Sequence, residues 1–219
     1  MIAIKRAAEP EVLQKHKGKW TQAFVEERGQ NPRARPRSER YAHANVKATL
    51  EAMSHHKCFY CERSTKDEKP EVDHFVEVAE KPELAFEWAN LYLACCDCNS
   101  AKNRARHIPP QDCIDPCGEG VRPEEHLAFE DELIRAKNES ATGLRTIQKY
   151  GLSRETLDLK RIRRLQSLRK VVDTLKDRMI ESGRKTLTSE ELSLLRSFAQ
   201  PDAPFSLMCG CYLDHHGFR

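Results

Sequence analysis

The sequence predicts an α+β fold that is mostly α-helical, with a small β element beside a group of cysteines. Three observations lead to this prediction. Apolar residues recur at three- and four-residue steps near both ends of the chain. Two Cys-x2-Cys pairs enclose a middle stretch with little helical character. Of the 219 residues, 39% are hydrophobic and 32% are charged, as expected of a soluble globular protein rather than a disordered one.

The first region, residues 1–56, is predicted to be mainly helical. It begins with a short strand over 1–6, and a helix follows over 10–26. The next segment, 28–40, holds five arginines and two prolines. Because proline removes a backbone donor and restricts the residue before it, this segment is predicted to be a loop. Helical spacing returns over 40–56.

The last region, residues 111–219, is also predicted to be mainly helical. It opens with an acidic, turn-rich segment over 111–139, which has nine Asp or Glu residues against three Lys or Arg residues. A long amphipathic helix is predicted from Ser153. The sequence "TSEE" at 188–191 is a capping box that starts a last helix, which is expected to end near Pro201.

The composition excludes an integral membrane protein. No apolar stretch reaches the roughly 20 residues that a membrane span requires. The sequence "MIAIKRAAEP" is charged too early for a signal peptide, so we expect a cytoplasmic protein with no membrane association. Thiols stay reduced there, and nine cysteines in such a compartment favour metal ligation over disulfides. The net charge of only +3 identifies no class of partner.

The middle region, residues 57–110, is predicted to bind a structural zinc ion. Two-residue spacing lets both thiolates of a tight turn reach one tetrahedral Zn²⁺ at about 2.3 Å. Four thiolates leave no open coordination position, so such a site is structural. The alternative is a set of reduced, buried thiols. The predicted zinc ligands are Cys58, Cys61, Cys95 and Cys98, and Cys96 between them is predicted to be a packing residue.

The residues between the two cysteine pairs are predicted to form a strand, a second strand and a helix, in that order. Asp73 and His74 lie in the first strand, flanked by apolar residues, and the second strand covers 91–94. Asn90 stands where the second strand begins, and Asn99 stands where the helix begins. This arrangement resembles the HNH, or ββα-metal, endonucleases. Their third position is often His, and here Asn99 occupies it.

The resemblance implies a zinc-clamped ββα-metal core, flanked by helices on both sides, that hydrolyses phosphodiester bonds in DNA or RNA. His74 would act as the general base, because an imidazole with a near-neutral pKa is effective at pH 7. Asp73 and the amide oxygen of Asn99 would hold one Mg²⁺ or a similar divalent cation. Asn90 would steady the loop that presents His74.

The resemblance extends beyond the core. The stretches "KCFYCE", "FEWANLYLACCDCNSAK" and "TIQKYGLSRETLDLKR" follow one another as in the PtuB subgroup of HNH nucleases. That subgroup supplies the nuclease subunit of Septu-type anti-phage systems, some of which are associated with retrons. The resemblance therefore implies an effector nuclease of a defence complex, with a PtuA-like ATPase subunit as its partner.

Basic side chains in two places are predicted to contact the phosphates of a nucleic acid. The predicted contacts are Lys102 and Arg104 after the second cysteine pair, and Arg33, Arg35 and Arg37 in the arginine-rich loop. The segment 154–185 also has eleven Lys or Arg against five Asp or Glu. It is either a solvated helix face or a further nucleic-acid surface.

Alternatives to a nuclease follow from the same residues. The main one is a catalytically inactive, zinc-stabilised module that binds nucleic acid or protein and is indifferent to Mg²⁺. Another is an antitoxin-like regulatory subunit, although the full set of Asp73, His74, Asn90 and Asn99 argues against it. A second metal site is a further alternative to unpaired thiols in loops; its cysteines would be Cys113, Cys117, Cys209 and Cys211.

Overall fold

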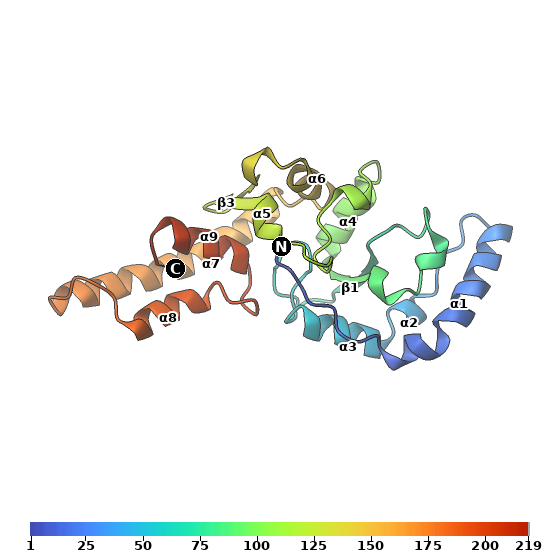
Figure 1. Cartoon of the computed structure of the whole chain (residues 1–219), viewed down its shortest axis with the longest axis horizontal. Coiled ribbons are helices and arrows are strands. Elements are labelled where there is room, and N and C mark those ends of the chain that lie inside the picture. The colour runs from blue at the N-terminus through green and yellow to red at the C-terminus, as the bar shows by residue number, and fades with distance from the viewer. Residues whose placement is uncertain (219) are drawn as a thin grey trace.

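The N-terminal helices form one arm of an elongated molecule (Figure 1). The computed structural model describes residues 1–218. Its first helices are α1 (Glu11–Gln30), α2 (Ser38–Tyr41) and α3 (Ala44–Met53). The helix predicted over 10–26 is confirmed and runs on to Gln30. The strand predicted over 1–6 is wrong, because no strand within residues 1–218 pairs with this segment; the Ile4 amide instead donates to the carbonyl of Pro116 at 2.7 Å.

The centre of the molecule is an antiparallel hairpin followed by a helix, as predicted. Strand β1 (Glu71–His74) pairs with β2 (Leu91–Ala94), and α4 (Cys96–Arg104) follows directly. The loop between the strands contains two short 3-10 turns, η1 (Pro82–Leu84) and η2 (Trp88–Asn90). The short strands leave the two ends of this loop side by side, so that the loop folds back over the end of β1.

The C-terminal region contains a second hairpin and four longer helices. Its elements are η3 (Pro110–Asp112), α5 (Pro123–His126), β3 (Leu127–Glu130), β4 (Leu133–Ala136), η4 (Lys137–Glu139), α6 (Ala141–Lys149), α7 (Glu155–Glu181), α8 (Ser189–Ser197) and α9 (Ser206–His215). The long helix and the capping box of α8 are confirmed. The prediction that α8 is the last helix is wrong, because the chain continues beyond Pro201 into α9. The acidic segment was predicted to be rich in turns, and the hairpin β3–β4 that it contains was not predicted. None of the helices in the described part of the chain is long and apolar enough to cross a membrane.

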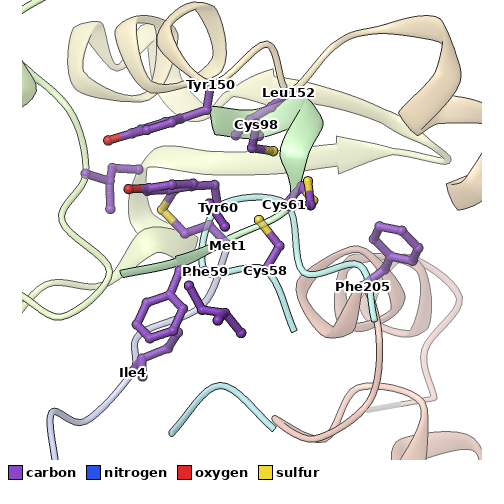
Figure 2. Packing of buried hydrophobic residues seen from close by; sticks show 14 of the residues in the cluster. Met1, Ile4, Cys58, Phe59, Tyr60, Cys61, Cys98, Tyr150, Leu152 and Phe205 are labelled. Carbon is purple, nitrogen blue, oxygen red and sulfur yellow. The ribbon is translucent and has the colours of Figure 1, made fainter. Parts of the chain in front are cut away.

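One large cluster of buried side chains joins all three predicted regions. It includes Met1 and Leu50 from the N-terminal region, Tyr60 from the middle, and Tyr150 and Leu213 from the C-terminal region. Figure 2 shows part of this cluster, with the cysteines packed among aromatic and aliphatic side chains. The α+β fold class is therefore confirmed, while the region boundaries at 56/57 and 110/111 stay a prediction.

A second, smaller cluster holds the arginine-rich loop against the hairpin loop. Phe24 of α1 and Ala34 of the arginine-rich loop pack with Ala85 and Phe86, which follow η1. The ring of Phe86 is 6.3 Å from that of Phe24 and 5.7 Å from that of Trp20, measured between centroids. The N-terminal arm thus places its arginines over the end of β1.

Gly143 provides a test of how α6 packs against α5. A side-chain carbon at Gly143 would overlap the carbonyl oxygen of His126, which belongs to the backbone. We expect Gly143→Ala to lower the free energy of unfolding by ~1–3 kcal/mol, although alanine favours helices. In α1, Gly18 has open space around it, so Gly18→Ala should raise that free energy by about 0.5–1 kcal/mol. Urea unfolding measures both changes, and equal effects would contradict this packing.

Candidate active site and metal centre

Four cysteine side chains converge in the middle of the molecule. They are buried, and their sulfur atoms all lie within 4.8 Å of one another. The sulfur atoms of Cys61 and Cys95 are 3.9 Å apart, which is close to the roughly 3.8 Å expected between thiolates around a tetrahedral zinc ion. The residues present therefore fit a zinc ion, and its ligands would be Cys58, Cys61, Cys95 and Cys98.

Backbone hydrogen bonds attach the first cysteine pair to the hairpin. The Phe59 amide donates to the carbonyl of Leu93 in β2 at 3.0 Å. The Cys58 amide donates to the carbonyl of Arg63, and the Glu62 amide donates back to the carbonyl of Cys58, both at 3.0 Å. Glu62 takes a left-handed conformation with φ of 62°, which lets the chain reverse within this short turn.

The predictions for the other cysteines need correction. Cys96 is exposed rather than packed, because it follows Cys95 into α4 and points about 100° away from it around the helix. The four cysteines of the alternative second metal site form no group of potential ligands within residues 1–218. Burial also raises the pKa of three of these thiols, to about 11 for Cys113 and Cys209 and about 12 for Cys117.

His74 ends β1, and its imidazole is in the form that a base requires. Its Nε2 lies 2.9 Å from the carbonyl oxygen of Ala85. A carbonyl can only accept, so Nε2 carries the hydrogen and Nδ1 keeps its lone pair. Burial lowers the pKa of His74 below its usual 6.5, which keeps the ring neutral at pH 7. The ring of Tyr41 packs against it, with the centroids 4.6 Å apart.

Asn90 holds the loop that provides the acceptor for His74. Its side-chain oxygen accepts from the Val76 amide at 2.7 Å. Its side-chain nitrogen donates to the carbonyls of Val76 and Leu84, both at 3.1 Å. Leu84 directly precedes Ala85, so the side chain of Asn90 fixes the backbone that orients the imidazole of His74.

Asp73 is buried beside His74 and is already hydrogen-bonded on both carboxylate oxygens. The hydroxyl of Tyr60 donates to Oδ2 at 2.6 Å. The ammonium of Lys102 lies 2.9 Å from Oδ1 and 3.0 Å from Oδ2, and it also donates to the carbonyl of His74. Because the Lys102 side chain is only 3% exposed, it faces inward here and does not offer its charge to a phosphate at the surface. This differs from the contact predicted for it.

Asn99 lies in the first turn of α4, next to β1. Its side-chain nitrogen donates to Oε2 of Glu71 at 2.6 Å, so the amide oxygen of Asn99 faces away from that carboxylate oxygen. Asn99 and Asp73 line the same groove, and a carboxylate with an amide oxygen suits a hard cation such as Mg²⁺. The donor chemistry fits, but a cation that binds both carboxylate oxygens of Asp73 must displace the ammonium of Lys102.

A groove of about 700 Å³ separates the arginine-rich loop from β1 and α4. Asp73, His74 and Asn99 lie on one wall, and Arg33 and Arg35 lie on the other. Five basic side chains and two acidic ones line the groove, so its charge suits a polyanion. Two predicted phosphate contacts, Arg37 and Arg104, do not line it.

Several residues that line this groove were not singled out in the sequence. They are Arg28 at the end of α1, Tyr41 after the loop, Glu77 in the hairpin loop, and Asn103 and Arg106 at the end of α4. Arg28, the first arginine of the arginine-rich segment, and the basic stretch "NRAR" at 103–106 were visible in the sequence. Which of these arginines face the groove depends on how the small cluster around Phe86 folds the loop.

Helix α6, the first long helix of the C-terminal region, packs against the site on the side away from the groove. The ring of Tyr150, just after α6, stacks on Tyr60 with centroids 3.9 Å apart, and Tyr60 in turn bonds to Asp73. The buried ammonium of Lys149 pairs with Glu77 at 2.8 Å and donates to a backbone carbonyl at 2.6 Å. This ion pair attaches the hairpin loop to α6.

The residues that form this site are similar to those of known proteins. Residues 58–105 match the family model described as HNH endonuclease. The chain is also similar to the Septu protein PtuB of Bacillus thuringiensis, with 34% identity over 104 residues. The matched stretch covers 47% of this chain and only 37% of the relative, well under two thirds of its length.

The residues matched by the family model contain the four clustered cysteines, both strands of the first hairpin and all of α4. The resemblance predicted from the sequence is therefore confirmed: residues 58–105 match the HNH endonuclease family, and the chain is similar to a Septu PtuB protein.

Proposed function

We propose that this chain is a metal-dependent HNH endonuclease that hydrolyses phosphodiester bonds in DNA or RNA. The observation that carries the proposal is the neutral imidazole of His74, oriented through Nε2 and placed in a basic groove, within the residues that match the HNH family. Such a groove attracts a phosphate backbone, and such an imidazole can remove a proton from water.

His74 acts in this proposal as the general base. The hydrogen bond from Nε2 to the carbonyl of Ala85 leaves the Nδ1 lone pair to accept a proton from the attacking water. The developing imidazolium is then stabilised by the same carbonyl and by the nearby carboxylate of Asp73. Asn90 is a positioning residue, since it acts on His74 through the backbone of the hairpin loop.

Asp73 and Asn99 would hold a divalent cation such as Mg²⁺ in the groove. When bound, the cation would neutralise charge on the scissile phosphate and on the leaving oxygen. Tyr60 keeps the carboxylate of Asp73 in place, and Lys102 compensates its charge until a cation arrives. Arg33 and Arg35 on the opposite wall would hold the flanking phosphates as fixed positive charges.

The zinc ion would be structural and would hold the two cysteine pairs together. The hairpin strands are only four residues long each, which is too little β structure to be stable alone. A closed site of four thiolates contributes directly to folding. It would keep β1, β2 and α4 at fixed separations.

The biological role follows from the relative rather than from the geometry. The name of the similar protein refers to the Septu system. We therefore assign the chain to anti-phage defence as an effector nuclease that works with a PtuA-like ATPase subunit.

One observation favours a second candidate function. Both carboxylate oxygens of Asp73 are occupied by Lys102 and Tyr60, and this arrangement also suits an inactive, zinc-stabilised module that binds nucleic acid without cutting it. Dependence of cleavage on Mg²⁺ separates the two candidates.

His74→Ala is expected to reduce nucleic-acid cleavage by about 100-fold or more, because the general base is removed. The fold and the zinc content should be retained. His107→Ala is the matched control, since His107 is exposed and lies outside the residues that line the groove. Cleavage of a labelled substrate measures the effect, and parental activity in His74→Ala would rule out this residue as the base.

Cys98→Ser should reduce the zinc content well below one ion per chain and lower the unfolding temperature, because it removes one of the four ligands. Cys96→Ser is the matched control, since Cys96 is two positions away and exposed. Elemental analysis and thermal unfolding measure both variants. Equal zinc content in the two would show that the cluster is a set of packed thiols.

Arg33→Gln and Arg35→Gln should each weaken nucleic-acid binding, whereas Arg37→Gln should change it little because Arg37 does not line the groove. Each effective substitution should reduce the slope of log K against log salt by about 0.7–0.9. Binding is measured in the His74→Ala background, which prevents cleavage. A larger effect of Arg37→Gln than of the other two would place the nucleic acid elsewhere.

A further inference from the structure

The arginine that precedes the long helix α7 reaches the cysteine cluster. One guanidinium nitrogen of Arg154 lies 3.5 Å from the sulfur of Cys98 and 3.9 Å from the sulfur of Cys95. The other terminal nitrogen donates to the carbonyls of Gly151 at 2.8 Å and Tyr150 at 3.3 Å. The side chain therefore connects the turn between α6 and α7 to both ligands of the second cysteine pair.

The turn that contains Arg154 packs tightly on the cysteine cluster. Gly151 has a φ of 56°, and a side-chain carbon there would come within 3.0 Å of the Ala101 side chain in α4. Leu152 is fully buried and belongs to the same hydrophobic cluster as Cys98 (Figure 2). Arg154 itself is only 19% exposed. The guanidinium is thus held over the sulfur atoms by the fold and does not swing freely in solvent.

The charge of a zinc site with four thiolates calls for such a group. Four thiolates and one Zn²⁺ carry a net charge of −2, and a buried charge is costly unless it is paired and hydrogen-bonded. A guanidinium donates charge-assisted hydrogen bonds and stays protonated at any ordinary pH. Arg63, at the first cysteine pair, is also buried and pairs with Glu68 and with Asp97, the latter at 2.8 Å. Arg154 lies farther from the same Asp97, at 3.9 Å, and its guanidinium donates to the sulfur atoms of Cys95 and Cys98.

We infer that Arg154 is a positioning residue of the zinc centre, which donates to the thiolates of Cys95 and Cys98 and thereby couples zinc binding to the docking of α7. This inference rests on the proposed zinc ion but not on nuclease activity. It gives α7 a function beyond packing, because the start of this helix completes the surroundings of the metal.

The test compares Arg154→Gln with Arg163→Gln, since Arg163 is an exposed arginine within α7 with no side-chain partner in the described part of the chain. Zinc affinity is measured by competition with a chromophoric chelator. Arg154→Gln should bind zinc about 10- to 100-fold more weakly, as expected for the loss of a group that orients metal ligands. Arg163→Gln should match the parent, and Arg154→Lys should restore part of the affinity.

Cobalt substitution provides a spectroscopic measurement that would not change if Arg154 only stabilised the fold. Removing a positive donor from the thiolates raises the energy of their electrons, so the sulfur-to-cobalt charge-transfer band of Arg154→Gln should shift to longer wavelength. Hydrogen exchange should also show loss of protection at the start of α7 when zinc is removed from the parent.

Four results would overturn the inference. The first is parental zinc affinity and an unshifted band in Arg154→Gln, and the second is equal losses in Arg154→Gln and Arg163→Gln. The third keeps the inference testable if Arg154→Gln does not fold: it is unchanged hydrogen-exchange protection at the start of α7 when zinc is removed from the parent. The fourth is a parent that binds no zinc, a result that leaves the role of His74 to its own cleavage assay.

Discussion

The meeting of four cysteine sulfurs is the constraint on which the rest of this structure depends. Cys58 and Cys61 lie in a turn that bonds to β2, whereas Cys95 and Cys98 begin α4. Bringing the pairs together closes a loop of 33 residues, 62–94, and that loop contains both the strand that ends in His74 and the segment that orients it. Two strands of four residues each could not maintain this arrangement by their own hydrogen bonds.

The flanking helices serve the site in different ways. The N-terminal arm supplies the opposite wall of the groove, since the cluster of Phe24, Ala34 and Phe86 fixes the arginine-rich loop on the hairpin loop. The C-terminal helices supply support from behind, through the stack of Tyr150 on Tyr60 and the ion pair of Lys149 with Glu77. The candidate catalytic side chains thus lie in the middle of the chain, but contacts from both ends hold them in place.

Much of the site was visible in the sequence because its residues have fixed short-range spacing. The two Cys-x2-Cys pairs, the Asp-His dipeptide and the asparagines before and after the second pair follow a local pattern that needs no knowledge of tertiary structure. The direction of the Lys102 side chain was not predictable, since a lysine on a short helix such as α4 can face either solvent or the core. Here the buried carboxylate of Asp73 draws the ammonium inward. The strand predicted over 1–6 failed because strand formation needs a partner, and the hairpin β3–β4 was missed because its strands are short and lie in an acidic segment.

The central claim is that the zinc-clamped hairpin presents a working hydrolytic site. Protein purified alone and after co-expression with the gene adjacent to its own is depleted of weakly bound divalent ions, with zinc content monitored throughout. It is then given labelled single-stranded DNA, double-stranded DNA and RNA, with and without Mg²⁺. We expect cleavage of at least one of these nucleic acids only when Mg²⁺ is added, at constant zinc. Binding without cleavage of any of them, whether Mg²⁺ and the co-expressed partner are present or not, would contradict it.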